Sequence, residues 1–152
     1  MGLDIVAYSK IKFIGNTEFV SSDLYINTNN EFTQHGTLAD GYYEYDNEYS
    51  FRAGSYSGYN DFRKDLAVVG GYTVKRLCYA PEAYRNHPFF DMVYFTDCDG
   101  VICSEICEKL YKEFVEYHHK ASGILSEWYM NIYNNFMEAF KIGADNGCVV
   151  FC

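Results

Sequence analysis

The segment from Ser50 to Asn60 combines residue types that bind polar ligands, and it lies between an expected strand and an expected helix. Backbone N–H groups at the start of a helix favour anions, and a glycine such as Gly54 lets a ligand approach the main chain closely. Arg52 supplies a guanidinium that can form two hydrogen bonds with a phosphate or carboxylate, and tyrosine rings can stack on a base. The segment therefore predicts a site for an anionic or nucleotide-like ligand, with the candidate residues Arg52, Gly54, Ser55, Tyr56, Tyr59 and Asn60.

The same segment also fits a plain structural turn. In that alternative, Ser57 caps the helix that follows, and Arg52 pairs with the carboxylate of Glu44 or Glu48. The segment matches no phosphate-loop consensus, so its sequence does not identify a ligand.

A second group of polar residues, Asp97-Cys98-Asp99-Gly100, follows an apolar run. Taken alone, the block resembles the first motif of the haloacid-dehalogenase phosphatases. That resemblance implies Asp97 as nucleophile, Asp99 as acid and base, and a required magnesium ion. Too little chain follows the block for the other motifs of that family. Two alternatives stay open: an Asp-Gly turn at a strand end, or a cleft in which Asp97 and Asp99 lie beside Arg52 and read ribose or base donors.

The six cysteines indicate free thiols in a reducing compartment, because no secretory signal accompanies them. Cys103 and Cys107 are four positions apart, as are Cys148 and Cys152, and neither spacing is typical of a zinc knuckle. We therefore expect no metal and no cofactor, and the sequence identifies no catalytic residue.

Composition narrows the classes of function. The 152 residues suffice for one domain with a proper hydrophobic core. A formal net charge of -9 argues against general nucleic-acid binding, which needs a basic surface. No apolar run approaches the ~20 residues of a membrane span, and no signal-peptide pattern is visible, so we expect a cytoplasmic protein. The 16 Tyr and 12 Phe indicate either a Tyr-rich core and half-buried sheet or an aromatic recognition surface.

Hydrophobic periodicity predicts the elements that position these residues. Strands are expected over residues 4–14, 23–28, 41–51, 89–96 and 148–151. Helices are expected over residues 59–69, 104–123 and 125–143, with caps at Ser57 and Ser104 and with stops at Gly70-Gly71, Gly123 and Gly143. Trp128 belongs to the expected buried stripe of the last helix, and residues 73–88 are expected to be mostly loop. This order predicts an α+β fold, an antiparallel or mixed sheet with about three helices packed against it in a single domain over residues 1–152.

Four blocks in order resemble a group of small uncharacterised proteins encoded by tailed bacteriophages. They are MGLDIVAY (residues 1–8), SFRAGSYSGYN (50–60), DCDG (97–100) and ADNGC (144–148). The resemblance carries no catalytic residues. It implies the cytoplasm of an infected bacterium and an accessory role, such as antagonism of host defence.

Three hypotheses follow, and all leave the oligomeric state open, including a homo-oligomer. The leading one is a non-catalytic phage accessory protein that binds a phosphorylated small molecule or nucleotide signal through Arg52, Gly54 and Ser55. In the second, an acidic, Tyr-rich interaction protein blocks a host defence protein. The third is a metal-dependent phosphoesterase with Asp97 as its chemical residue.

Overall fold

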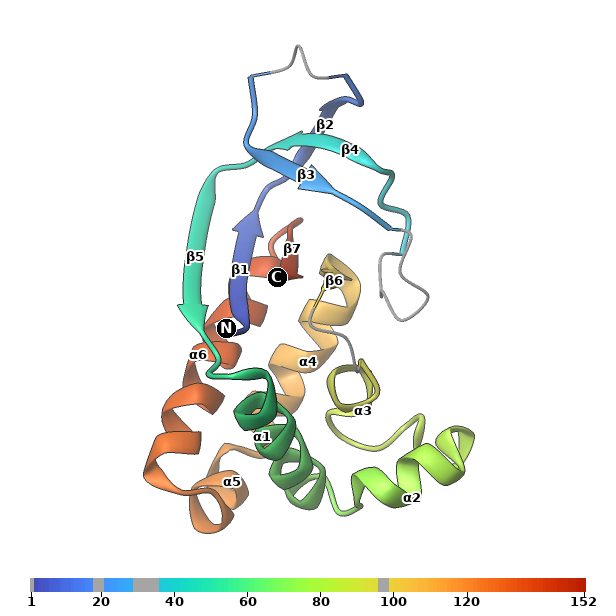
Figure 1. The fold of residues 1–152 in the computed structure, drawn as a ribbon, viewed down its shortest axis with the longest axis vertical. Coiled ribbons are helices and arrows are strands. Elements are labelled where there is room, and N and C mark those ends of the chain that lie inside the picture. The colour runs from blue at the N-terminus through green and yellow to red at the C-terminus, as the bar shows by residue number, and fades with distance from the viewer. Residues whose placement is uncertain (1, 18–20, 29–35, 96–98) are drawn as a thin grey trace.

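A four-stranded antiparallel sheet forms the centre of the structure, with its strands in the order β5-β1-β7-β6 (Figure 1). The computed structural model describes residues 2–17, 21–28, 36–95 and 99–152. The strands of this large sheet are β1 (Asp4–Ser9), β5 (Asn47–Arg52), β6 (Gly100–Cys103) and β7 (Cys148–Phe151). Strand β1 alternates buried and half-buried residues, which is typical of a strand with one face on the core.

A second, smaller sheet continues the first one. It contains β2 (Lys12–Gly15), β4 (Gly41–Glu44) and β3 (Leu24–Ile26) in the order β2-β4-β3. The chain bends between the sheets at Lys10, whose φ is 50°. The register is unchanged across the bend, since Asp4 lies opposite Arg52 and Lys12 lies opposite Glu44. The strands predicted over residues 4–14 and 41–51 are therefore confirmed in extent, but each is divided between two sheets.

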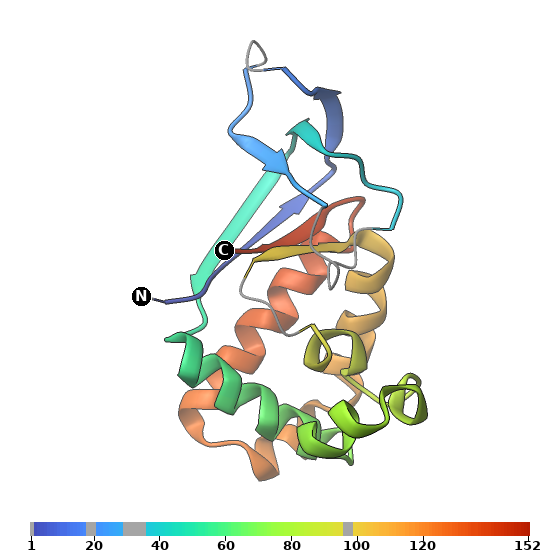
Figure 2. The same cartoon turned by 45° about the vertical axis from the view of Figure 1, so that its right-hand side comes forward.

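Helices cover only one face of the large sheet (Figure 2). The three longest are α1 (Tyr56–Val69), α4 (Ser104–Glu116) and α6 (Glu127–Gly143). The shorter ones are α2 (Val74–Tyr79), the 3-10 helix η1 (Pro81–Tyr84), α3 (Phe90–Val93) and α5 (His118–Ile124). The fold is thus α+β and a single compact domain, as the sequence predicts. None of the helices among the described residues is long and apolar enough to cross a membrane.

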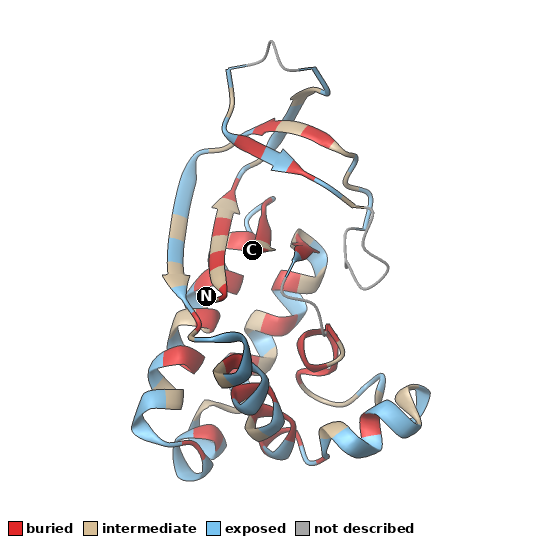
Figure 3. Cartoon of the chain, viewed as in Figure 1, coloured by how far each residue is buried: buried red, intermediate tan, exposed pale blue. Residues whose placement is uncertain are grey.

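The core between the helices and the large sheet is rich in phenylalanine. Phe136 is fully buried, stacks with Phe62 and Phe151, and receives the edge of Phe51 from β5. A second, smaller apolar cluster lies between the two sheets and contains Leu24, Ile26, Tyr43, Val101 and Cys148. In Figure 3 buried residues concentrate along the inner faces of the helices, whereas β5 is largely exposed.

Several predicted elements were wrong, for reasons that the structure makes plain. The apolar run over residues 89–96 contains the helical turn α3, because Phe89 has a φ of 66° and starts a turn. Short apolar runs do not separate strands from buried helices. Residues 73–88 contain α2 and η1 rather than loop. Thr73 caps α2, and Pro81 occupies the first position of η1.

Cap positions and one buried residue also need correction. Ser55 rather than Ser57 caps α1, so the cap lies two residues earlier than predicted and the helix begins at Tyr56. Ser104 is the first residue of α4, and its hydroxyl donates to the carbonyl of Ala144 instead of capping. The helix predicted over residues 104–123 is divided at Tyr117. Trp128 is 67% exposed and does not belong to the core.

Candidate functional site

One end of the large sheet brings together residues from four separate parts of the chain. Asp4 lies opposite Arg52, and the main chains of Asp4 and Cys152 exchange hydrogen bonds of 2.8 and 2.9 Å. Extending the β6–β7 register by one position places Asp99 across from Cys152. Cross-strand neighbours point to the same face of a sheet. These residues therefore form a row, here called the sheet-end row: Arg52, Asp4, Cys152 and Asp99.

The row lies on the sheet face that the helices leave uncovered. It alternates along the strands with Ile5, Phe51 and Phe151, which pack towards the helices. Arg52, Cys152 and Asp99 are exposed, and Asp4 is half-buried. The row is therefore open to a ligand approaching from solvent.

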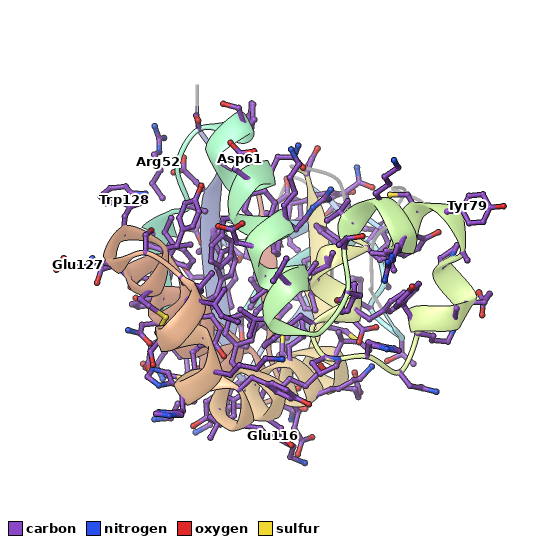
Figure 4. The ribbon with its side chains drawn as sticks, turned by 90° about the horizontal axis from the view of Figure 1, so that it is seen from below. Arg52, Asp61, Tyr79, Glu116, Glu127 and Trp128 are labelled. Carbon is purple, nitrogen blue, oxygen red and sulfur yellow. The ribbon has the colours of Figure 1, made fainter. Side chains whose placement is uncertain are left out.

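Arg52 and Asp4 form the central interaction of the row. The Nε and Nη2 atoms of Arg52 donate to the two carboxylate oxygens of Asp4 at 2.8 Å each. This hydrogen bonding holds the pKa of Asp4 below its usual range and raises the pKa of Arg52. The partner of Arg52 is thus Asp4, not Glu44 or Glu48. Both side chains are close to half exposed or more, and Arg52 reaches the periphery of the molecule (Figure 4).

The thiol of Cys152 lies between two carboxylates. Burial raises its pKa, and the negative charges of Asp4 and Asp99 raise it further. A thiol with a raised pKa is a poor nucleophile near neutral pH, because the thiolate is the reactive form. The sheet-end row therefore fits recognition of hydrogen-bond donors and charges better than covalent catalysis.

The start of α1 adjoins this row. The Ser55 hydroxyl accepts a hydrogen bond of 3.0 Å from the Gly58 N–H. Gly54 has a φ of 107°, and a side chain at that position would meet no other atom within 4 Å. Tyr56 is 40% exposed, and its phenol is close enough to Arg52 to raise the pKa of the guanidinium. The structure therefore brings together Arg52, Gly54, Ser55 and Tyr56.

Helix α1 also differs in charge from α4 and α6 at its start. Its first turn contains no acidic residue, whereas Glu105 and Glu127 occupy the first turns of α4 and α6. The partial positive charge at the start of α1 is therefore not neutralised by its own side chains. Asn60 is exposed on the same helix, one turn after Tyr56.

Tyr59 is placed apart from the other predicted ligand-binding residues. It is 5% exposed and packs against Phe136 and Phe151 in the core. Its hydroxyl makes no hydrogen bond with a described residue, and burial raises its pKa. Tyr59 therefore supports the core beneath α1, and its ring is not available at the surface where Tyr56 lies.

Asp97 lies outside the described residues, and the described residues 73–95 before Asp99 contain no strand. The segment before it is the helical turn α3, and Asp99 precedes β6 in an antiparallel sheet. The strand that carries the first motif in haloacid-dehalogenase phosphatases is thus absent from the described residues before Asp99. No group of three His, Cys, Asp or Glu side chains within the described ranges is arranged to hold a metal ion.

Another titratable group, Glu113 on α4, was not predicted from the sequence. Its Oε2 accepts a hydrogen bond of 3.0 Å from the Phe89 N–H, and its Oε1 is buried without a partner among the described residues. Burial raises the pKa of Glu113 to about 7, although the Phe89 hydrogen bond and Lys109 act in the opposite direction. Such a carboxyl is a functional candidate on chemical grounds. Its hydrogen bond to the Phe89 main chain gives it a structural part at the start of α3.

Two cavities lined by described residues lie away from this site. One of about 160 Å³ separates the small sheet from the start of α4 and includes Tyr43, Cys103 and Asn146 in its lining. A larger groove of about 680 Å³ lies along α2 and η1. None of the predicted site residues lines either cavity. At the start of α1 and in the sheet-end row, Arg52, Ser55, Tyr56 and Cys152 are exposed.

Comparison with known proteins identifies no relative at a significant level. No family model matches the chain, and no curated protein and no solved structure matches it.

Proposed function

We propose that this chain is a non-catalytic accessory protein of a tailed bacteriophage that binds a phosphorylated or nucleotide-like small ligand in the infected cell. The ligand's anionic group lies at the start of α1, against the Gly54 main chain and the Ser55 hydroxyl, with Arg52 beside it. Binding there sequesters a host defence signal. No covalent step is involved, and no metal is needed.

The observation that carries this proposal is the charge at the start of α1. The formal net charge of the chain is -9, yet the first turn of α1 contains no carboxylate. Gly54 leaves open space beside the main chain, and the nearby Arg52 side chain is 61% exposed. A helix start without acidic side chains and with an adjacent guanidinium attracts phosphate.

The Asp4 carboxylate competes with the ligand in this arrangement. It occupies two N–H groups of Arg52, and an exposed ion pair of this kind contributes little net stability. A phosphate can therefore replace Asp4 as the partner of Arg52. Without a ligand, the Asp4 carboxylate occupies the place of the ligand's anionic group on Arg52. This competition lowers the affinity of the protein for the ligand.

Opposite effects of two neighbouring substitutions test the proposal. The probes are inorganic phosphate, a nucleoside monophosphate and a cyclic dinucleotide, titrated calorimetrically into the full chain. Asp4→Asn removes the competing charge and should tighten binding, whereas Arg52→Ala should weaken it by about 10-fold or more, since charged hydrogen bonds contribute about 1.5–3 kcal/mol.

Arg85→Ala is the matched control, because Arg85 forms a similar exposed bidentate pair with Glu82 on η1. It should leave binding unchanged. If the probes bind and neither Asp4→Asn nor Arg52→Ala changes the affinity of any of them, the proposed site is refuted. The absence of binding by every probe would refute the anion-binding function itself.

A second candidate function is favoured by the exposed aromatic side chains. Trp128 is 67% exposed and Tyr79 is 93% exposed, and aromatic residues are enriched in protein interfaces. In this alternative the acidic, Tyr-rich surface blocks a host defence protein. It predicts a partner recovered by affinity capture from host extract, with recovery reduced by Trp128→Ala and unaffected by Arg52→Ala.

A further inference from the structure

The groove along α2 and η1 has a mostly apolar lining. Its volume is about 680 Å³, which is in the range of sites that bury an aromatic group. Its lining includes Tyr79, Ala80, Ala83 and Tyr84. This groove is separate from the start of α1 and plays no part in the function proposed above.

The groove is also locally basic in an acidic protein. Lys75 and Arg76 line it, no acidic side chain does, and both cations are exposed. Neither forms an ion pair with any described residue, whereas the nearby Arg85 pairs with Glu82. The groove is therefore suited to an occupant that presents an aromatic ring flanked by carboxylates.

Such an occupant is present on the opposite side of the same molecule. Trp128 projects from the first turn of α6 with 67% of its surface exposed. Glu127 precedes it, and Asp61 of α1 is close enough to the neighbouring Tyr129 to raise the pKa of that phenol. Asp61 forms an exposed ion pair of 3.3 Å with Lys64, and a pair of this kind contributes little stability, so its carboxylate can exchange partners. We call this surface the Trp128 corner; its residues are Asp61, Glu127, Trp128 and Tyr129.

The two surfaces cannot meet within one chain. Seen from below, Trp128 and Glu127 lie at one side of the molecule and Tyr79 at the other (Figure 4). Each surface is thus available only to another molecule. A contact between two different patches of identical chains is heterologous and repeats head to tail.

We propose that the α2–η1 groove binds the Trp128 corner of a second copy of this chain. The indole ring enters the apolar part of the groove, and the carboxylates of Asp61 and Glu127 face Lys75 and Arg76. One helix corner and one groove make a small interface. The association is therefore weak, with a dissociation constant in the micromolar to millimolar range.

Sedimentation velocity of the full chain over increasing concentration tests this proposal at about 0.15 M salt, where long-range repulsion between the acidic chains is screened. The sedimentation coefficient of the wild type should rise with concentration. Trp128→Ala should weaken the association about 30-fold, the usual effect of removing a central interface tryptophan. Because Trp128 is largely exposed, this variant should fold like the wild type.

Charge reversal on each surface gives a sharper test. Lys75→Glu with Arg76→Glu, and separately Asp61→Lys with Glu127→Lys, should each be monomeric. A mixture of the two variants should associate again, because each acidic surface then meets a basic one. Lys112→Glu with Lys141→Glu is the control, because it lowers the net charge by as much as the groove variant but lies outside both surfaces. This control variant should associate like the wild type.

Three outcomes would overturn the proposal. The wild type could remain monomeric at every concentration. Association could survive in both charge-reversed variants or in Trp128→Ala, which would place the contact on another surface. The control variant could lose association as fully as the groove variant, which would assign the effect to net charge.

Discussion

Glu113 shows how a single buried carboxyl couples the helical core to pH. It lies on α4, accepts a hydrogen bond from the Phe89 N–H and leaves one oxygen without a described partner. Phe89 itself has a φ of 66°, which is rare for a bulky side chain. The hydrogen bond to Glu113 holds the main chain at this position, where α3 begins.

Replacing Glu113 with Gln should stabilise the protein at high pH. The pKa of Glu113 is about 7 in the folded chain against 4.5 for the unperturbed group. Below about pH 4.5 both states are protonated and the group has no effect on folding. As pH rises towards 7 the unfolded state ionises first, so the folded state loses up to roughly 3 kcal/mol. Urea unfolding should therefore give equal stabilities for the two proteins at pH 4.5 and a more stable Gln variant at pH 8.

Glu116→Gln is the matched control, since Glu116 is exposed on the same helix. Its stability relative to the wild type should change little over the same pH range. A Glu113→Gln effect that is the same at both pH values would show that Glu113 titrates normally.

The residue types at the start of α1 could be identified from the sequence, but their partners could not. Arg52, Gly54, Ser55 and Tyr56 are neighbours along the chain, so their proximity needs no knowledge of the fold. Asp4 and Cys152 join them only through strand register, which pairs residues that are far apart in sequence. Tyr59 was predicted to bind the ligand, although it stands at helical spacing to Phe62 and Leu66. The structure buries all three side chains together.

At the level of elements, the turn between α6 and β7 is fixed by its approach to β1. A Cβ atom at Gly147 would lie 1.7 Å from the Tyr8 carbonyl oxygen. Lys10 and Ile11 also donate main-chain hydrogen bonds to the carbonyls of Asp145 and Asn146. This turn therefore anchors the bend at which the chain passes from the large sheet to the small one.

Gly147→Ala should destabilise the protein by about 3 kcal/mol or more, because the new methyl group overlaps main-chain atoms that cannot move independently. Gly123→Ala is the comparison. Gly123 is exposed in α5, and a Cβ there meets nothing within 4 Å. That change should stabilise the protein by about 0.5–1 kcal/mol through helix propensity. Thermal unfolding of both variants checks the pair, and equal midpoints would contradict this account of the turn.

Long periodic segments were predictable at the element scale, and short ones were not. The alternation over residues 41–51 and the stripes of α1, α4 and α6 reflect burial on one face, which the sequence records directly. The bend at Lys10 depends on a single φ value and leaves no periodic signal. Strand β6 was missed because its four residues are all buried and continue straight into α4.

The molecule as a whole has two apolar clusters on opposite faces of one sheet. Cys107 belongs to the helix-side cluster and Cys148 to the cluster between the sheets. Burial raises the pKa of Cys107 and raises that of Cys148 to about 12. Each thiol is therefore unreactive while its own cluster is intact. Alkylation of Cys107 thus reports unfolding of the helix-side cluster, and alkylation of Cys148 reports unfolding of the cluster between the sheets.

We expect the large sheet with its helices and the small sheet to unfold together, because the strand pair that crosses the bend keeps one register from Asp4–Arg52 to Phe13–Tyr43. Pulse alkylation in increasing urea, read by mass spectrometry of peptides, should label Cys107 and Cys148 at the same midpoint. Cys78 and Cys152 are exposed and should be labelled without urea, with Cys78 the faster because the pKa of Cys152 is raised. Labelling of Cys148 at lower urea than Cys107 would instead show that the small sheet detaches first. In that case the bend at Lys10 is a boundary between two folding units. The large sheet and its helices then stay folded without the apolar cluster between the two sheets.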